Sequence, residues 1–194
     1  MTQIVKRGFV PSDEIEFNEE NLTLLKKAQK DIYYLINQGY SIDKSVEFVG
    51  NHFLFSARQR LALKRSTSSY KDIISRQKRK ILDTYENSTL HIDGLNIIIT
   101  LEVALSNSTL IKCMDGTLRD LAGLRGTYKL IDKTDTAIDL IGKRLDKMKI
   151  RKAIFYLDSP VSNTGRLKSR LLELLYKYNF DIEVILIPNA DVIL

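Results

Sequence analysis

Three aspartates end short apolar runs, at a spacing that could bring their carboxylates together. Asp93 ends LHID, Asp115 ends IKCMD and Asp158 ends IFYLD. If each run is a strand of one parallel sheet, the three side chains meet at its carboxyl edge, where open α/β sheets place their sites. Carboxylates about 4 Å apart repel by about 4 kcal/mol at an effective dielectric constant of 20, so the cluster needs a cation or shared protons. Oxygen ligands favour Mg²⁺ or Mn²⁺, which suit phosphodiester hydrolysis.

Further polar residues could complete such a site. Asp120 and Asp135 are candidates for an additional catalytic acid, and Asn96 and Asn163 could orient water or substrate. The loop DSPVSNTGR, which ends at Arg166, precedes a helix and is rich in groups that bind phosphate. We therefore include Asn96, Asn163 and Arg166 among the expected nucleic-acid contacts.

Each of these residues also has a structural interpretation. Asp is a common turn starter, Asp135 would meet the dipole of a helix in its first turn, and Ser162 or Asn163 could cap a helix. Gly94 predicts a tight turn directly after the first strand. His52 and His91 stand alone in the sequence, and we interpret both as structural.

The elements that must position the acids alternate in type beyond residue 87. Short apolar runs predict strands at 90–92, 110–114, 153–157 and 182–187, and helical periodicity predicts helices at 95–105, 133–148 and 166–178. This alternation predicts parallel strands with helical crossovers. The apolar tail 191–194 follows the last strand, so either further chain or a second copy could complete the sheet.

The first part of the chain has a different pattern. Apolar residues at helical spacing predict a helix from Glu19 to Gln38 that ends at Gly39, and further helices beginning at Ser41 and near Ser56. A basic helix is expected over 70–85. We therefore predict two domains, a helical basic domain at 1–86 and an α/β domain at 87–194.

Positive charge is concentrated in one segment. Residues 58–83 hold nine Lys or Arg against two Asp, a local charge of +7, while the whole chain carries +6. Such a cluster is typical of a surface that contacts phosphate backbones, and a solvated helix face is the alternative. The candidate contact residues are Arg58, Arg60, Lys64, Arg65, Arg76, Lys78 and Arg79.

The composition narrows the class of protein. Among 194 residues, 44% are hydrophobic and 28% charged, which is typical of a globular protein. No apolar run approaches the roughly 20 residues that span a bilayer, so no membrane partner is expected. The single cysteine, Cys113, lies in an apolar run and fits a reducing, cytoplasmic location.

Several motifs resemble known families. IDGLN at 92–96 resembles the first strand of PIN-like and NYN-type ribonucleases, and KTDTAIDLI and FYLDSPVSN resemble their later acid-bearing segments. The basic helical region combined with DGLN, DGTLRD, GTYK and LDSPVSNTGRL is similar to an uncharacterised prokaryotic, mainly archaeal, family over nearly the whole chain. PIN-like enzymes place a last acid after a further strand, whereas this sequence stops near Asp191. NYN-type proteins carry an acid-x-acid pair where Ser159 and Pro160 follow Asp158.

The resemblance implies a C-terminal PIN-like three-layer α/β domain with a mostly parallel sheet, and for the archaeal family it implies a fold and no established activity. Together with the acids at the strand ends, it leads us to expect a nuclease that acts on RNA with Mg²⁺ or Mn²⁺ held by Asp93, Asp115 and Asp158. Three alternatives stay open. The protein could bind nucleic acid without cleaving it, or the helices between residues 41 and 65 could form a helix–turn–helix regulator of DNA. A Toprim-like metal-binding domain is the competing fold.

Overall fold

The computed structural model describes residues 5–81, 84–123 and 126–194, which form two compact units. The helical unit comprises Gly8–Ile81 and Thr109–Leu121, and the α/β unit comprises the other described residues. The units therefore alternate along the chain, because residues 109–121 interrupt the sequence of the α/β unit. Among the described residues, no helix combines the length and the apolar character needed to cross a membrane.

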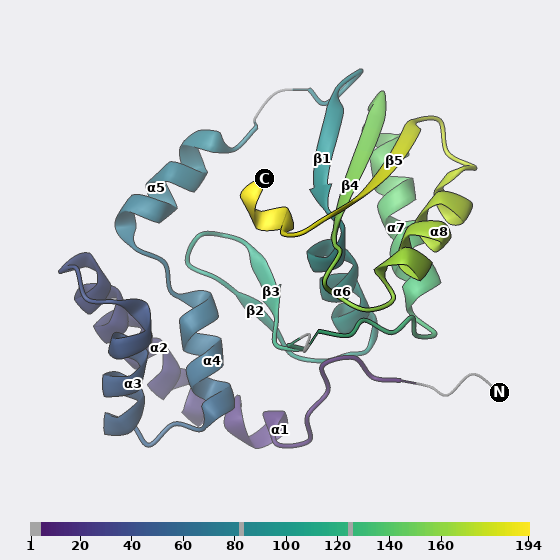
Figure 1. The fold of residues 1–194 in the computed structure, drawn as a ribbon. Helices are drawn as coiled ribbons and strands as arrows, with labels where there is room; N and C mark the ends of the chain where they lie inside the picture. The colour runs from purple at the N-terminus through teal and green to yellow at the C-terminus, as the bar shows by residue number, and fades with distance from the viewer. Residues whose placement is uncertain (1–4, 82–83, 124–125) are drawn as a thin grey trace. The chain divides into compact units, whose positions relative to one another are not determined.

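The helical unit is built from helices that each follow a polar N-cap residue. They are α1 (Asp13–Glu16), α2 (Glu19–Asn37), α3 (Ile42–His52), α4 (Ala57–Ser66) and α5 (Tyr70–Arg79) (Figure 1). Asn18, Ser41, Ser56 and Ser69 each accept a backbone N–H at the start of α2 to α5, which satisfies a donor that the helix leaves unpaired. The predicted helix starts at Ser41 and Ser56 are confirmed. The predicted basic helix ends earlier than expected, and its residues 82 and 83 lie outside the described ranges.

Apolar side chains at helical spacing hold α2, α3 and α4 together. Leu25, Ala28 and Ile32 of α2 pack with Val46 and Val49 of α3, and Phe55 and Leu63 complete this buried core. Gly39, with a φ of +92°, ends the turn after α2 as the sequence predicted.

A two-stranded antiparallel hairpin also belongs to the helical unit. Its strands are β2 (Leu110–Lys112) and β3 (Leu118–Asp120), and they form a sheet of their own. The prediction that 110–114 is a strand of the parallel sheet is therefore wrong. The physical reason is the short connection between the strands, because a parallel partner would need a crossover of a dozen or more residues. Gly116, with a φ of +82°, lies in the turn.

The α/β unit contains a parallel sheet with the strand order β1-β4-β5. Its elements are β1 (Thr89–Asp93), α6 (Gly94–Leu105), α7 (Thr134–Lys147), β4 (Lys152–Asp158), α8 (Thr164–Leu175), β5 (Asp181–Ile187) and the short 3-10 helix η1 (Ala190–Val192). Figure 1 shows the three strands side by side, with β4 in the centre. The predicted mixed α/β architecture with parallel strands is confirmed.

The two faces of this sheet differ. Side chains alternate along a strand, so Ala153, Phe155 and Leu157 of β4 share one face, and all three are fully buried. Helices α6 and α8 contact β4, and α7 packs against both of them. On the other face, Tyr156 packs with Ile187 of β5 and with Ala190 of η1.

Candidate functional site

Asp93 ends β1 and is also the N-cap of α6. Its Oδ1 accepts the backbone N–H of Asn96 at 2.9 Å, and its Oδ2 accepts the Asn96 side-chain amide at 2.6 Å. The predicted tight turn is wrong, because α6 begins directly at Gly94. A Cβ atom at residue 94 would lie 2.6 Å from Leu157 Cδ2 and 3.2 Å from the Tyr156 carbonyl oxygen. Gly94 therefore permits close approach of α6 to β4.

Asp158 and Asp191 lie at the same edge of the sheet. Asp158 ends β4, and its Oδ1 accepts the backbone N–H of Ala190 at 2.7 Å, which ties η1 to the end of β4. Asp191 follows Ala190 in η1, and its N–H donates to Asn189 Oδ1 at 3.0 Å. Each of the three parallel strands thus ends in, or is closely followed by, an aspartate.

The surroundings of Asp93 shift its pKa. Burial raises the pKa of Asp93, the two hydrogen bonds from Asn96 lower it, and the negative charges of Asp158 and Asp191 raise it. Like charges oppose ionisation, and a cation at this edge of the sheet would relieve their repulsion. Sequence reasoning missed Asp191, although its position just after the last strand was the available signal.

The carboxylates at this edge of the sheet could bind a hard cation only together with other ligands. Within the described ranges, no group of three His, Cys, Asp or Glu side chains is arranged to hold a metal ion. Mg²⁺, however, commonly binds through one or two carboxylates, with water and substrate phosphates as its other ligands. Asp93 and Asp158 fit that mode of binding.

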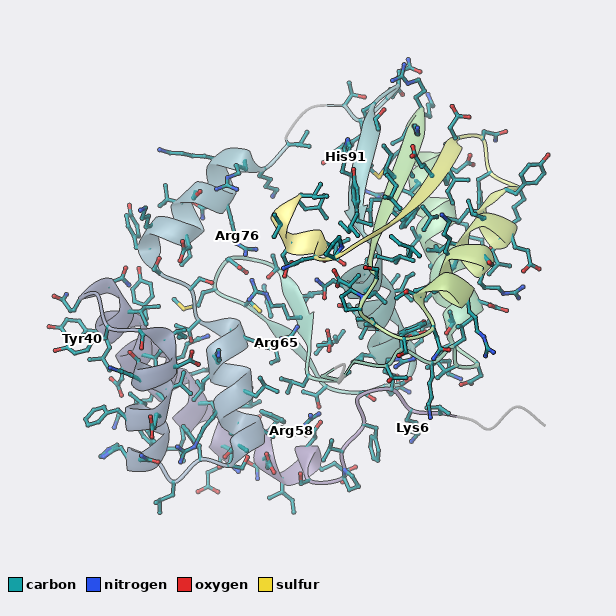
Figure 2. All side chains as sticks on the ribbon, in the orientation of Figure 1. Lys6, Tyr40, Arg58, Arg65, Arg76 and His91 are labelled. Atoms are coloured by element: carbon teal, nitrogen blue, oxygen red, sulfur yellow. The ribbon has the colours of Figure 1, made fainter. Side chains whose placement is uncertain are left out.

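A histidine and a tyrosine lie beside these acids. His91 and Asp93 share one face of β1, as Tyr156 and Asp158 share one face of β4. The Nδ1 atom of His91 and the Tyr156 hydroxyl oxygen are 2.8 Å apart. Figure 2 shows His91 on β1, and its side chain is exposed. The strand alternation in the sequence could have identified this pair.

Asp115 and Asp120 belong to the helical unit, so the expected meeting of Asp115 with Asp93 and Asp158 in one sheet is wrong. The Asp115 side chain is fully buried, and its Oδ2 lies 2.9 Å from Arg119 and 3.3 Å from Arg76. Burial opposes ionisation, but hydrogen bonds from Thr117 and the charges of both arginines lower the pKa of Asp115. This carboxylate is neutralised inside its own unit.

The remaining candidate acids are also paired. Asp120 lies in β3, buried, with its Oδ2 3.6 Å from Arg65. Asp135 lies in the first turn of α7, where Arg170 binds both of its oxygens, and the bond from Arg170 Nε is 2.7 Å long. Arg170 also lowers the pKa of Asp135, mainly through its hydrogen bonds. Asp135 thus joins α7 to α8.

The loop after β4 is fixed by hydrogen bonds. Asn163 occupies the cap position of α8 with a φ of +69°, but its side chain makes no cap hydrogen bond. Its amide instead donates to the Tyr128 carbonyl oxygen at 2.9 Å. Asn163 is therefore the N-cap residue of α8, as one of the two structural alternatives expected, although its side chain does not cap the helix. The Arg166 side chain is exposed on α8.

Seven cationic side chains of the helical unit were predicted to contact nucleic acid. Two of them bind groups of the helical unit itself. Arg58 binds Asp13 with two nitrogens and donates to the Leu121 and Gly8 carbonyl oxygens at 3.0 and 2.9 Å. Arg60 donates to the Phe55 and Gly50 carbonyl oxygens at 2.8 and 3.0 Å. Their guanidinium groups fix the chain around α4.

The other cations of the segment are more accessible. Lys64 pairs with Asp43 on the surface, and Arg65 pairs with Asp120. Figure 2 labels Arg65 on α4. Helix α5 has no buried residue, and a cleft of about 540 Å³ lies between it and the hairpin turn. The cationic side chains that line this cleft are Arg76, Arg79 and Lys80. Lys78 is exposed on the same helix.

Comparison with known proteins places the chain in a family. Residues 24–79 match the family described as "Protein of unknown function (DUF434)". An uncharacterized protein of Methanocaldococcus jannaschii is 36% identical over 168 residues, which make up 86% of this chain and 80% of the relative. No solved structure matches the chain. Residues 82–194, more than half of the chain, match the "Domain of unknown function (DUF5616)", and the protein therefore belongs to this family.

Proposed function

We propose that the protein is a metal-dependent nuclease that cleaves RNA, with a PIN-like α/β unit. Its catalytic carboxylates are Asp93, Asp158 and Asp191. One observation carries the proposal: Asp93 and Asp158 end neighbouring parallel strands, and the Ala190 N–H that binds Asp158 holds η1, with Asp191, at the same edge of the sheet. A half-buried carboxylate with like charges beside it in an open α/β sheet is suited to hold a divalent cation.

Asp93 and Asp158 would hold Mg²⁺ or Mn²⁺ together with a phosphate oxygen of the RNA. The bound metal would supply charge stabilisation and an activated water. Asn96 holds both oxygens of Asp93, and the Ala190 N–H holds one oxygen of Asp158, so neither carboxylate turns freely. Asp191 contributes a third negative charge from η1.

The proposed set of three acids differs from the sequence-based metal site in one acid, and the two additional catalytic acids are left out. Asp191 takes the place of Asp115, whose carboxylate is neutralised by two arginines in the helical unit. Asp120 and Asp135 are left out because Arg65 and Arg170 pair with them. Asn96 acts on Asp93 rather than directly on water.

The test is cleavage of a fluorescently labelled single-stranded RNA in the presence of Mg²⁺ or Mn²⁺. Asp93→Asn and Asp158→Asn should each lower the cleavage rate by about 100-fold or more, because each removes a charged ligand of the metal. The bound metal would lower the barrier by several kcal/mol through charge stabilisation. Asp31→Asn, an exposed aspartate on α2, is the matched control and should cleave normally. Circular dichroism checks that all variants fold. Equal cleavage by all variants, or cleavage in EDTA, contradicts the proposal.

A second candidate function is nucleic-acid binding without cleavage, through α5. The observation that favours it is the cleft beside α5, lined by Arg76, Arg79 and Lys80. Clustered cations that face a hollow can bind several phosphates and release counterions. The helix–turn–helix alternative has less support, because Arg58 and Arg60 of α4 bind carbonyl oxygens of their own unit.

A further inference from the structure

A second hollow lies at the opposite end of the parallel sheet from the acids. This cleft, of about 920 Å³, is lined by the connections that lead into β4 and β5. Figure 1 shows both connections at the amino ends of these strands, away from the start of α6. The acidic site does not explain this cleft, which belongs wholly to the α/β unit.

Three aromatic side chains gather in the connection between α8 and β5. Tyr176 is 87% exposed and contributes little to folding. Tyr178 and Phe180 stack, with ring centres 6.1 Å apart and an angle of 9° between the rings. The Tyr178 hydroxyl donates to Asp139 at 2.7 Å, so this ring is held in place. A fixed pair of rings with an exposed third ring offers a stacking surface for a flat ligand.

Two cations from the connection between α7 and β4 line the same cleft. Lys149 pairs with Glu86 at 3.0 Å, but both side chains are more than half exposed. Arg151 makes a long contact of 3.4 Å with the Thr89 hydroxyl. Exposed ion pairs of this kind contribute little to stability. Either cation can therefore turn to an anionic ligand at small cost.

The charge around the cleft limits the class of ligand. Asp146 and Asp181 also line it, and Asp146 accepts the backbone N–H of Asn179 at 3.0 Å and its side-chain amide at 3.3 Å. The two acids balance the two cations in charge, which makes this a poor surface for a duplex with many phosphates. Aromatic rings beside one or two cations suit a single base with its phosphate.

We propose that this cleft binds one unpaired nucleotide, with its base stacked on Tyr176 and its phosphate at Lys149 or Arg151. The shared chemistry is a nucleobase joined to a phosphate, and it could come from a free nucleotide or from one position of a single-stranded RNA. The inference does not rest on the proposed nuclease activity, because the cleft and the three acids lie at opposite ends of the sheet.

The experiment uses the full chain in EDTA, so that metal-dependent cleavage plays no part. Uridine 5′-monophosphate is titrated by calorimetry, and a short fluorescein-labelled oligouridylate by fluorescence anisotropy. Tyr176→Ala should weaken binding by roughly 5- to 150-fold, the range for losing one stacked base. Arg151→Gln should also weaken it. Tyr34→Ala removes a 64% exposed tyrosine from α2 of the helical unit and should leave both affinities unchanged.

The two ligands distinguish the two sources. Weaker binding of both ligands, or of the oligonucleotide alone, identifies an RNA strand as the ligand, and weaker binding of the mononucleotide alone identifies a free nucleotide. If Tyr176→Ala and Arg151→Gln bind both ligands as the unsubstituted protein does, the proposal is overturned. Loss of cleavage in the nuclease assay would leave this result unaffected.

Discussion

The His91 Nδ1 atom lies 2.8 Å from the Tyr156 hydroxyl oxygen, on the sheet face that also carries Asp93 and Asp158. The two rings are nearly parallel, with centres 5.8 Å apart. Tyr156 is only 7% exposed, whereas His91 is exposed. A buried tyrosine therefore holds an exposed histidine in one orientation, about two residues along β1 from the proposed metal ligand.

Removing this hydrogen bond should reduce stability without disturbing the sheet. Tyr156→Phe keeps the packed ring and should lower the free energy of unfolding by about 0.5–1.5 kcal/mol, the usual net value of one hydrogen bond. Urea unfolding of Tyr156→Phe, His91→Ala and the double variant forms a double-mutant cycle. The second substitution should cost less when the first is present, and strictly additive losses would show that the two side chains do not interact.

Gly94 should not tolerate even a methyl group. A Cβ there would lie 2.6 Å from Leu157 Cδ2, inside contact distance, and 3.2 Å from a backbone oxygen that cannot turn away. Gly94→Ala should lower the free energy of unfolding by about 1–3 kcal/mol, as overpacking does. Gly165→Ala in α8 is the control, because nothing lies within 4 Å of its Cβ position. That change should stabilise the protein by about 0.4–1 kcal/mol. Equal effects of the two substitutions in chemical unfolding would contradict the role of Gly94.

Hydrophobic periodicity was enough to predict most elements but not how the strands pair. The helix from Glu19 and the strands that end at Asp93 and Asp158 follow directly from spacing. Leu110–Lys112 has the same apolar signature as these strands, yet it pairs antiparallel with Leu118–Asp120. The length of the connection decides that pairing, and apolar content alone does not report it.

The candidate site was predicted only in part, because the sequence does not show which side chains meet in the fold. Acids at strand ends pointed to Asp93 and Asp158, whose places in neighbouring parallel strands follow from the fold. The roles of Asp115 and Arg58 depend on partners that are distant in the sequence. Arg76 pairs with Asp115, and Asp13 pairs with Arg58. A charged residue's type does not reveal whether its partner is solvent, a ligand or another part of the chain.

Asp115 should make the free energy of unfolding depend on pH in the acid range. Its pKa is lowered in the folded protein, so its contribution to stability is fully present above the pKa of the unfolded chain, about 3.9, and is lost as the pH falls through the folded value. Chemical unfolding of the unsubstituted protein and of Asp115→Asn should therefore differ most at neutral pH. The difference should shrink below about pH 4. A difference that stays constant down to pH 2.5 would argue against this ion pair.

Asp93 should affect the pH dependence of stability in the opposite direction. Its pKa is raised, so ionised Asp93 opposes folding, and the relative stability of the protein falls as the pH rises through the folded value. Asp93→Asn keeps an acceptor for the Asn96 N–H but removes the charge. In EDTA near pH 7 it should raise the free energy of unfolding by up to about 1 kcal/mol, because the group is partly solvated. With Mg²⁺ and RNA, only the unsubstituted protein should gain thermal stability from the metal. A metal-induced shift of equal size in Asp93→Asn would remove Asp93 from the proposed metal ligands.

Helix α5 should govern the salt dependence of nucleic-acid binding. Lys78, Arg79 and Lys80 are exposed at its end, and replacing all three by Gln removes three charges. If each contacts a phosphate, the slope of log affinity against log salt concentration for single-stranded RNA should become less steep by about 2, at roughly 0.7 per contact. The same change at the exposed Lys26, Lys27 and Lys30 of α2 is matched in charge and should leave most of the slope intact. Fluorescence anisotropy between about 50 and 200 mM salt measures both slopes. If the slope becomes less steep by the same amount in both triple variants, binding depends only on the net charge of the protein. That result would contradict specific phosphate contacts at α5.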